Sequence, residues 1–247
     1  MKILSKTQYG EIYLLEDKTV VKKSRLSKID FDKENPFTET NILSKLSDSN
    51  YVVKYISSWN DQKYYYLKME YLPYELFCLI TEDKLSYINK KSIFKQLLLA
   101  LKEIHGKGVY HLDISTENIL LDEDLNVKLC DFGMSAVSPI STIYRKTRYG
   151  KLSYMCPYYK KSEIFDGAKC DIFAAGIVFF VMLTKHLPWT LTSDKDEHFK
   201  TIYTKGRLKF ILDIWNIDLT NNDLEILKST LCPPDERKNI DELLKLC

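Results

Sequence analysis

The hydrophobic pattern of this chain changes its period once, near Leu72–Pro73, and that change limits the folds the chain can adopt. Before it, short runs of alternating β-branched and aromatic residues predict strands. After it, apolar residues recur at helical spacing, and an unbroken apolar run at 172–183 predicts a helix buried on all sides. We therefore expect an α+β chain, with a small β-rich part followed by a larger, mainly helical part.

The expected elements are short in the first part and longer in the second. Two strands flank an EDK turn within residues 11–23, and two further strand-like runs lie at 51–59 and 63–72. A helix is expected over 35–48, with Pro36 near its start. The helices expected in the second part lie at 89–108, 172–183, 223–231 and 239–247.

Composition and charge exclude several classes of protein. The 247 residues carry a net charge of +2, so charge alone does not suggest binding to nucleic acid or to a membrane surface. The apolar run at 172–183 is too short to span a bilayer, which needs about 20 residues. Six scattered cysteines without a C-x-x-C pair, and an N-terminus unlike a signal peptide, lead us to expect an intracellular, reducing compartment.

Two polar stretches carry the groups that chemistry would use. HLDISTENIL, at 111–120, places Asp113 five positions before Asn118, and DFG begins at Asp131. Carboxylate and amide oxygens suit Mg²⁺, and a carboxylate that binds no metal can accept a proton from a hydroxyl. Taken singly, such residues are more often turn or cap residues. Their combination in this order is typical of phosphoryl transfer.

With these two stretches, the chain resembles a eukaryotic protein kinase along nearly its full length. HLDISTENIL stands where that family has H-R-D-L-x-x-x-N, and DFG is unaltered. The resemblance implies a serine/threonine kinase that uses ATP and Mg²⁺. It also implies that Asp113 orients the substrate hydroxyl and accepts its proton, while Asn118 and Asp131 hold magnesium.

The resemblance also implies an ion pair in the first part of the chain. The sequence VVK at 20–22 is similar to the V-A-I-K strand, so Lys22 is expected to contact the α- and β-phosphates and to pair with Glu39. Lys23 is a rival for this role, but Lys22 fits the spacing that lets Val20 line the nucleotide pocket. The alternative for both Lys22 and Glu39 is a solvated surface charge, the usual state of these residue types.

The rest of the expected nucleotide pocket follows from the same resemblance. LKMEYLP, at 67–73, is similar to the hinge between the two lobes of a kinase, with Met69 as the gatekeeper. The backbone of Glu70 and Leu72 would bond the adenine. The other positions expected around the nucleotide are Leu4, Gly10, Ile12, Val20 and Leu120.

Other residues that match the family's pattern are expected to hold the site residues in position. Asp171 fits an aspartate of the buried helix that braces the catalytic loop, and Arg237 fits a late arginine of the family. The family's internal apolar column, which links the two lobes, is matched by Leu43, Tyr55, His111 and Phe132.

Several positions depart from the family's pattern. Ser5 and Thr7 replace two glycines of the loop that covers the phosphates, which predicts weaker ATP binding and not its loss. Ser115 stands where most serine/threonine kinases have a lysine that stabilises the transferring phosphate, which predicts a slower reaction. Lys151 stands where a threonine usually lies beside the substrate pocket, and Tyr158 replaces a glutamate that normally forms an ion pair.

One departure concerns regulation. Leu112 replaces an arginine that, in many kinases, pairs with a phosphate on the activation segment. We therefore expect that phosphorylation of that segment, for example at Thr147, is dispensable for activity. The short stretches WN, at 59–60, and HLD, at 111–113, are also similar to the kinases that inhibit cyclin-dependent kinases and to relatives that act on translation initiation.

The resemblance implies one bilobal kinase domain, with residues 1–72 as the N-lobe and 73–247 as the C-lobe. The expected function is ATP-dependent phosphorylation of protein serine or threonine residues. The alternative, favoured by the altered glycine loop, Ser115 and Tyr158, is a pseudokinase that binds nucleotide or a partner protein with little or no phosphotransfer. A kinase-like enzyme that acts on a small molecule is a third, remote hypothesis.

The expected partners are a protein substrate and ATP, without nucleic acid or membrane. The protein is expected to be a monomer in the cytoplasm or the nucleus. Targeting is expected to come from the kinase surface or from another protein.

Overall fold

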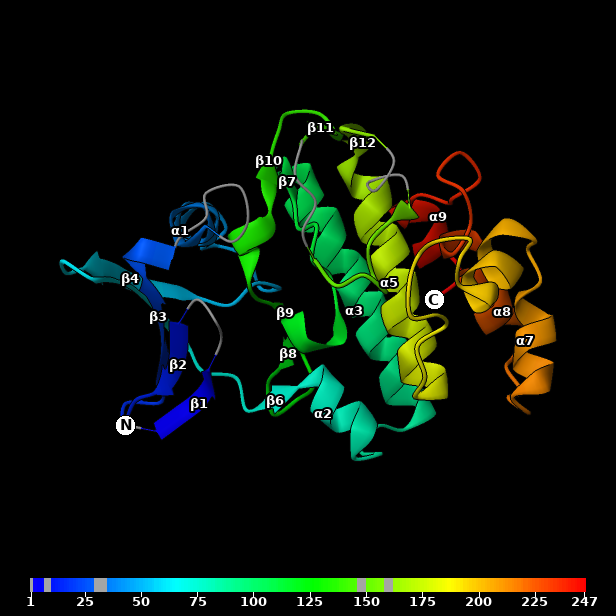
Figure 1. Cartoon of the computed structure of the whole chain (residues 1–247). Coiled ribbons are helices and arrows are strands. Elements are labelled where there is room, and N and C mark those ends of the chain that lie inside the picture. The colour runs from blue at the N-terminus through cyan, green and yellow to red at the C-terminus, as the bar shows by residue number, and fades with distance from the viewer. Residues whose placement is uncertain (1, 7–9, 29–34, 146–149, 158–161) are drawn as a thin grey trace.

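Figure 1 shows the computed structural model of the chain, which describes residues 2–6, 10–28, 35–145, 150–157 and 162–247. The first part is a five-stranded antiparallel sheet with the strand order β1-β2-β3-β5-β4. The strands are β1 (Lys2–Lys6), β2 (Gly10–Leu14), β3 (Thr19–Arg25), β4 (Tyr55–Asn60) and β5 (Tyr64–Glu70). The strand runs and the EDK turn expected from the sequence are therefore confirmed.

Helix α1 (Pro36–Lys45) packs against β4 and β5 and carries Glu39 on its buried face. The side chain of Asn35 caps the helix by accepting two backbone N–H groups of the first turn, and Pro36 occupies the start of the helix. The backbone N–H of Asn35 donates to the carbonyl of Gly133, 3.0 Å away. This hydrogen bond ties the start of α1 to the DFG sequence in the second part.

The second part begins with a small sheet and two long helices. Strand β6 (Tyr74–Glu75) pairs with β8 (Ile119–Leu121), which pairs with β9 (Val127–Leu129). Helices α3 (Tyr87–Gly106) and α5 (Gly167–Thr184) pack against each other, and α3 also contacts β9. In Figure 1 this small sheet lies between the five-stranded sheet and the long helices.

Shorter elements complete the chain. The remaining strands are β7 (Val109–Tyr110), β10 (Ala136–Val137), β11 (Thr142–Tyr144) and β12 (Ile164–Asp166). Among the described residues, the remaining α-helices are α2 (Leu76–Thr81), α6 (Glu197–Phe199), α7 (Leu208–Ile214), α8 (Asn221–Thr230) and α9 (Ile240–Leu244). The 3₁₀ turns are η1 (Leu26–Lys28), η2 (Thr116–Asn118) and η3 (Phe132–Met134), and η4 (Lys200–Thr204) is a π-helical turn.

Helix α5 forms the centre of the second part. In the described residues it is the one helix whose length and composition would let it cross a membrane, but 83% of it is buried inside the protein. Its Phe179 stacks on Phe94 of α3, with ring centroids 4.2 Å apart. The prediction of a helix buried on all sides is therefore confirmed, as is the α+β, two-part fold.

Candidate active site

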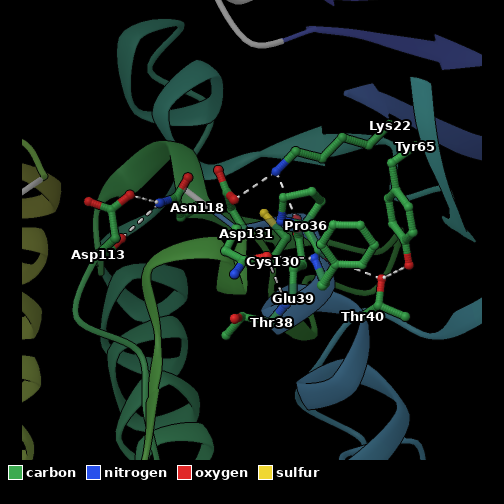
Figure 2. Close-up of polar contacts among 12 residues, drawn as sticks. Lys22, Pro36, Thr38, Glu39, Thr40, Tyr65, Asp113, Asn118, Cys130 and Asp131 are labelled. Carbon is green, nitrogen blue, oxygen red and sulfur yellow. Dashed lines mark hydrogen bonds and ion pairs between the residues drawn. The ribbon is translucent and has the colours of Figure 1, made fainter. Parts of the chain in front are cut away.

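An ion-paired lysine joins three segments of the fold at the centre of the site. The ammonium of Lys22, on β3, lies 2.9 Å from a carboxylate oxygen of Glu39, on α1, and 2.9 Å from one of Asp131. Figure 2 shows these contacts as dashed lines that meet at the lysine nitrogen. The side chain of Glu39 is 1% exposed and that of Lys22 is 13% exposed. The alternative of two solvated surface charges is therefore wrong.

Strand geometry separates Lys22 from its neighbour. Successive side chains of β3 point to opposite faces of the sheet. Lys22 lines the large cavity described below, whereas the ammonium of Lys23 lies 4.0 Å from the centroid of the Tyr64 ring. The geometry therefore favours Lys22, and not Lys23, as the phosphate-binding lysine.

The catalytic-loop sequence folds so that Asn118 holds Asp113. The amide nitrogen of Asn118 donates to a carboxylate oxygen and to the backbone carbonyl of Asp113, both at 2.8 Å (Figure 2). Burial raises the pKa of Asp113 to about 7, and the negative charge of Asp131 adds to that rise. A carboxylate whose pKa lies near neutrality is well suited to take a proton from a hydroxyl.

A buried aspartate holds the backbone of this loop. Asp171, on α5, is fully buried, and its two carboxylate oxygens accept the backbone N–H groups of His111 and Leu112, both at 2.8 Å. Leu112 has a φ of 63°, a conformation that costs free energy for a residue with a side chain. The two hydrogen bonds offset this cost, so Asp171 fixes the backbone directly before Asp113.

His111 fills the space between the catalytic loop and the DFG sequence as a neutral imidazole. Its Nδ1 accepts the backbone N–H of Asp113 at 3.3 Å, so its proton lies on Nε2, which is 3.0 Å from a backbone carbonyl. Burial lowers the pKa of His111, in agreement with a neutral ring. The ring packs on Phe132, with centroids 4.7 Å apart. Of the other expected column residues, Leu43 is fully buried and Tyr55 is partly buried against the core.

Asp131 is ionised and lines the cavity beside Asn118. Burial raises the pKa of Asp131, but the charge and hydrogen bond of Lys22 outweigh that effect, so the pKa lies below its ordinary value. Asp131 and Asn118 line the same cavity and together offer carboxylate and amide oxygens, which fit Mg²⁺. The described residues hold no cluster of three His, Cys, Asp or Glu side chains, so a magnesium ion would take its other ligands from water and phosphate.

A cavity of about 530 Å³ lies between the five-stranded sheet and the second part of the chain. Its volume is that of a typical small-molecule site. The expected nucleotide-binding residues that line it are Leu4, Ile12, Val20, Lys22, Met69, Glu70, Leu72 and Leu120. Gly10 does not line the cavity and instead lies directly against the backbone carbonyl of Lys23. Sequence reasoning missed Val53 and Cys130, which also line the cavity and belong to no motif.

Backbone contacts that no motif predicts hold the segment after DFG. The guanidinium of Arg145 donates to the carbonyls of Met134, at 2.7 Å, and Ser135, at 3.3 Å. Strand β11 of this segment pairs with β12. Three positions on which the sequence analysis commented, Thr7, Thr147 and Tyr158, lie outside the described residues, so the expectations about them stay predictions.

Arg237 is buried between the end of α8 and the start of α5. It is 2% exposed, and its guanidinium donates to the backbone carbonyls of Thr230, Lys169 and Cys232. The guanidinium carbon also lies 5.0 Å from the centroid of the Phe173 ring. These contacts compensate for the burial of its charge.

Lys151 contacts the catalytic loop, which sequence reasoning missed. Its ammonium lies 2.7 Å from the hydroxyl oxygen of Ser115 and 2.9 Å from a carboxylate oxygen of Glu117. A signal for this contact was present in the sequence. Position 115 has a hydroxyl where a lysine was expected, and position 151 has a lysine where a hydroxyl was expected.

Comparison with known proteins agrees with this geometry. The family model described as the protein kinase domain matches residues 6–246. CBL-interacting protein kinase 2 of Oryza sativa subsp. japonica is 27% identical over 255 residues, which cover 99% of this chain and 56% of that protein. CBL-interacting serine/threonine-protein kinase 5 of Arabidopsis thaliana is 33% identical over 174 residues, which cover 69% of this chain and 38% of that protein.

The chain spans about half the length of the first of these relatives and less of the second. The family match nevertheless runs from the last residue of β1 to beyond α9, across both parts of the fold, and it includes Lys22, Glu39 and both polar stretches of the site. The use of ATP and Mg²⁺ is general in that family, and the cavity and its oxygen ligands are of the kind that such use requires. This chain belongs to the protein kinase family.

Proposed function

We propose that the chain transfers the γ-phosphate of ATP to serine or threonine hydroxyls of a protein substrate. The observation that carries this proposal is one arrangement of charges: Lys22 paired with both Glu39 and Asp131, beside an Asp113 that Asn118 holds in place. A chain that only bound nucleotide would not need a carboxylate held in this way next to the metal ligands. The relatives, which are named as kinases, support the same function.

Each of these residues has a role that its geometry allows. Lys22, positioned by Glu39, contacts the α- and β-phosphates of ATP. Asn118 and Asp131 hold Mg²⁺, which supplies charge neutralisation to the phosphates when it is bound. Asp113, with a pKa of about 7, orients the substrate hydroxyl and takes its proton.

The loop over the phosphates supports nucleotide binding despite its lost glycines. Ser5, which replaces the first of them, lines the cavity together with Leu4. A serine at this point can therefore still lie over a nucleotide, although its backbone has less conformational freedom than that of glycine. Binding of ATP is expected to be weaker and not absent.

Labelled ATP tests the proposal most directly. The purified chain would be incubated with labelled ATP, Mg²⁺ and a generic basic protein, beside Asp113→Asn, Asp131→Asn and Asp218→Asn proteins. Asp218 is exposed and remote from the cavity, so its variant is the matched control. Label on serine or threonine that is lost in the first two variants and kept in the third supports the proposal. A wild-type protein that binds ATP but transfers no more label than Asp113→Asn would show a pseudokinase.

We further propose that the chain works as a monomer in a reducing compartment, the cytoplasm or the nucleus. All six cysteines are free thiols, and Cys156 and Cys170 are buried. Mass from light scattering and thiol counting on protein extracted under alkylating conditions would test these points. A dimer mass, or a disulfide in the extracted protein, would contradict them.

A further inference from the structure

The ammonium of Lys151 contacts two residues of the catalytic loop. The ammonium of Lys151 is 2.7 Å from the hydroxyl oxygen of Ser115, which is itself fully buried and lies two residues after Asp113. The same ammonium forms an ion pair of 2.9 Å with Glu117. The side chain of Lys151 remains 37% exposed, and Lys151 and Asp113 line the same small pocket.

The backbone around Lys151 is built for this position. Gly150 has a φ of 119°, a conformation that favours glycine, and a Cβ there would lie 3.2 Å from a carboxylate oxygen of Asp113. The glycine therefore lets the segment pass close to the catalytic aspartate. On the other side, the carbonyl of Lys151 accepts the backbone N–H groups of Tyr154, at 2.9 Å, and Met155, at 3.0 Å. The backbone of Lys151 is thus held by these two hydrogen bonds, and Gly150 brings it close to Asp113.

The charge of Lys151 reaches both carboxylates of the reaction. Burial and the charge of Asp131 raise the pKa of Asp113, and the charge of Lys151 opposes them. For Asp131, burial raises the pKa, Lys22 lowers it, and Lys151 adds to the lowering. Lys151 therefore lies within electrostatic range of the space between these two carboxylates, where a phosphoryl group passes to a hydroxyl.

Phosphoryl transfer requires a cation in this space. Lys22 pairs with Glu39 and Asp131 and is expected to contact the α- and β-phosphates, so it does not supply this cation. Catalysis of this reaction depends on positioning and on stabilising the charge that spreads over the oxygens of the transferring group. A lysine at the position of Ser115 would supply such a charge, and this chain has a hydroxyl there instead.

We propose that Lys151 is a catalytic residue that supplies this cation: its ammonium contacts the transferring phosphoryl group, with Ser115 and Glu117 holding it in place. In that step the substrate hydroxyl gives its proton to Asp113, and its oxygen bonds to the γ-phosphorus. The bond from that phosphorus to the bridging oxygen breaks, and ADP leaves with the electron pair. This role rests on the proposed kinase function.

The test compares Lys151→Ala and Lys151→Arg with the wild type and with Lys209→Ala. Lys209 is an exposed lysine that pairs with Asp213, so its variant is the matched control. Steady-state kcat, the KM values for ATP and protein substrate, and the thermal midpoint would be measured for each. We expect Lys151→Ala to lower kcat about 100-fold with little change in the KM for ATP or in the thermal midpoint. Lys151→Arg should keep most of the activity.

A relocated charge gives a second readout. The double variant Lys151→Ala, Ser115→Lys carries the ammonium at position 115 and not at position 151. Its kcat should be at least about tenfold higher than that of Lys151→Ala alone. Four results would overturn the proposal. The first two are a Lys151→Ala kcat within about threefold of the wild type and a Lys151→Arg protein as impaired as Lys151→Ala. The other two are a Lys151→Ala effect confined to the KM for protein substrate and a thermal midpoint of Lys151→Ala that falls together with its kcat. A wild type without phosphotransfer overturns the proposed function itself, and this inference with it.

Discussion

Lys22 and Asp131 lie 109 positions apart in the sequence, and their ammonium and carboxylate groups are 2.9 Å apart in the structure. The contact joins the five-stranded sheet to the DFG sequence across the nucleotide cavity. It also means that one carboxylate has two duties, because Asp131 is both the partner of the phosphate-binding lysine and the expected ligand of magnesium.

Asp131→Asn should remove the effect of Mg²⁺ on nucleotide binding. The wild type is expected to bind ATP more tightly with Mg²⁺ than without it, because an ionised carboxylate is a strong magnesium ligand and an amide is a weak one. The variant should show about the same affinity in both conditions, measured by titration with a fluorescent ATP analogue. An unchanged response to Mg²⁺ would contradict the assignment of Asp131 as a metal ligand.

Glu39→Gln should weaken the positioning of Lys22. A hydrogen bond between charged groups contributes about 1.5–3 kcal/mol, so kcat/KM for ATP should fall roughly 10- to 100-fold. Glu103→Gln is the matched control, because Glu103 is also paired with a lysine but lies on α3, away from the cavity. Equal activity in the two variants would show that the buried ion pair of Glu39 does not position the lysine.

Gly10→Ala should destabilise the sheet. A Cβ at this position would lie 1.8 Å from the backbone carbonyl of Lys23 on the neighbouring strand, so the backbone must shift. A loss of about 1–3 kcal/mol in the free energy of unfolding is expected. Gly106→Ala is the control: a Cβ there meets no atom within 4 Å, and it should be neutral or stabilise α3 by up to about 1 kcal/mol. Denaturant unfolding of both variants checks this contrast.

His111 should make stability depend on pH below neutrality. Burial holds the pKa of folded His111 below its ordinary value of 6.5, so the unfolded chain takes up a proton first as the pH falls. The free energy of unfolding should therefore be constant in this term above pH 6.5 and should fall below it, by up to about 1.4 kcal/mol per pH unit. His111→Gln should show a weaker dependence in urea unfolding between pH 5 and 7.5; parallel curves for the two proteins would contradict the assignment.

Much of the fold followed from hydrophobic period alone. Helix α3 and strands β2 to β5 are long enough for a period of 3.6 or 2 to be visible in the sequence, and α5 is visible as a long unbroken apolar run. Strands β7, β10, β11 and β12 contain only two or three residues, which is too few to show any period. They form because the long helices and the catalytic loop bring their backbones together, and that information is not local.

The residues of the site also divide into those that sequence motifs predicted and those that they did not. Lys22, Glu39, Asp113, Asn118 and Asp131 were assigned through motifs. Four of them line one cavity, and Asp113 is hydrogen-bonded to one of these four, Asn118. Gly10 was assigned in the same manner and does not reach the cavity wall.

The exchanged residue types at positions 115 and 151 were visible in the sequence, but the contact of Lys151 with Ser115 could not be assigned by motif. It joins residues 36 positions apart and depends on the backbone conformation of Gly150, which has a φ of 119°. Neither the separation nor that conformation can be read from the residue types alone.

When the chain is compared with its family one position at a time, Ser115 and Lys151 count as two separate defects, and together they suggest decay. In the structure the two positions together still supply one ammonium and one hydroxyl, which are in contact, with the two groups exchanged between the positions. A substitution that looks disabling in isolation can therefore be half of a compensated pair. When one catalytic residue of a kinase is replaced, the residues that contact its position should be inspected before the protein is classed as inactive.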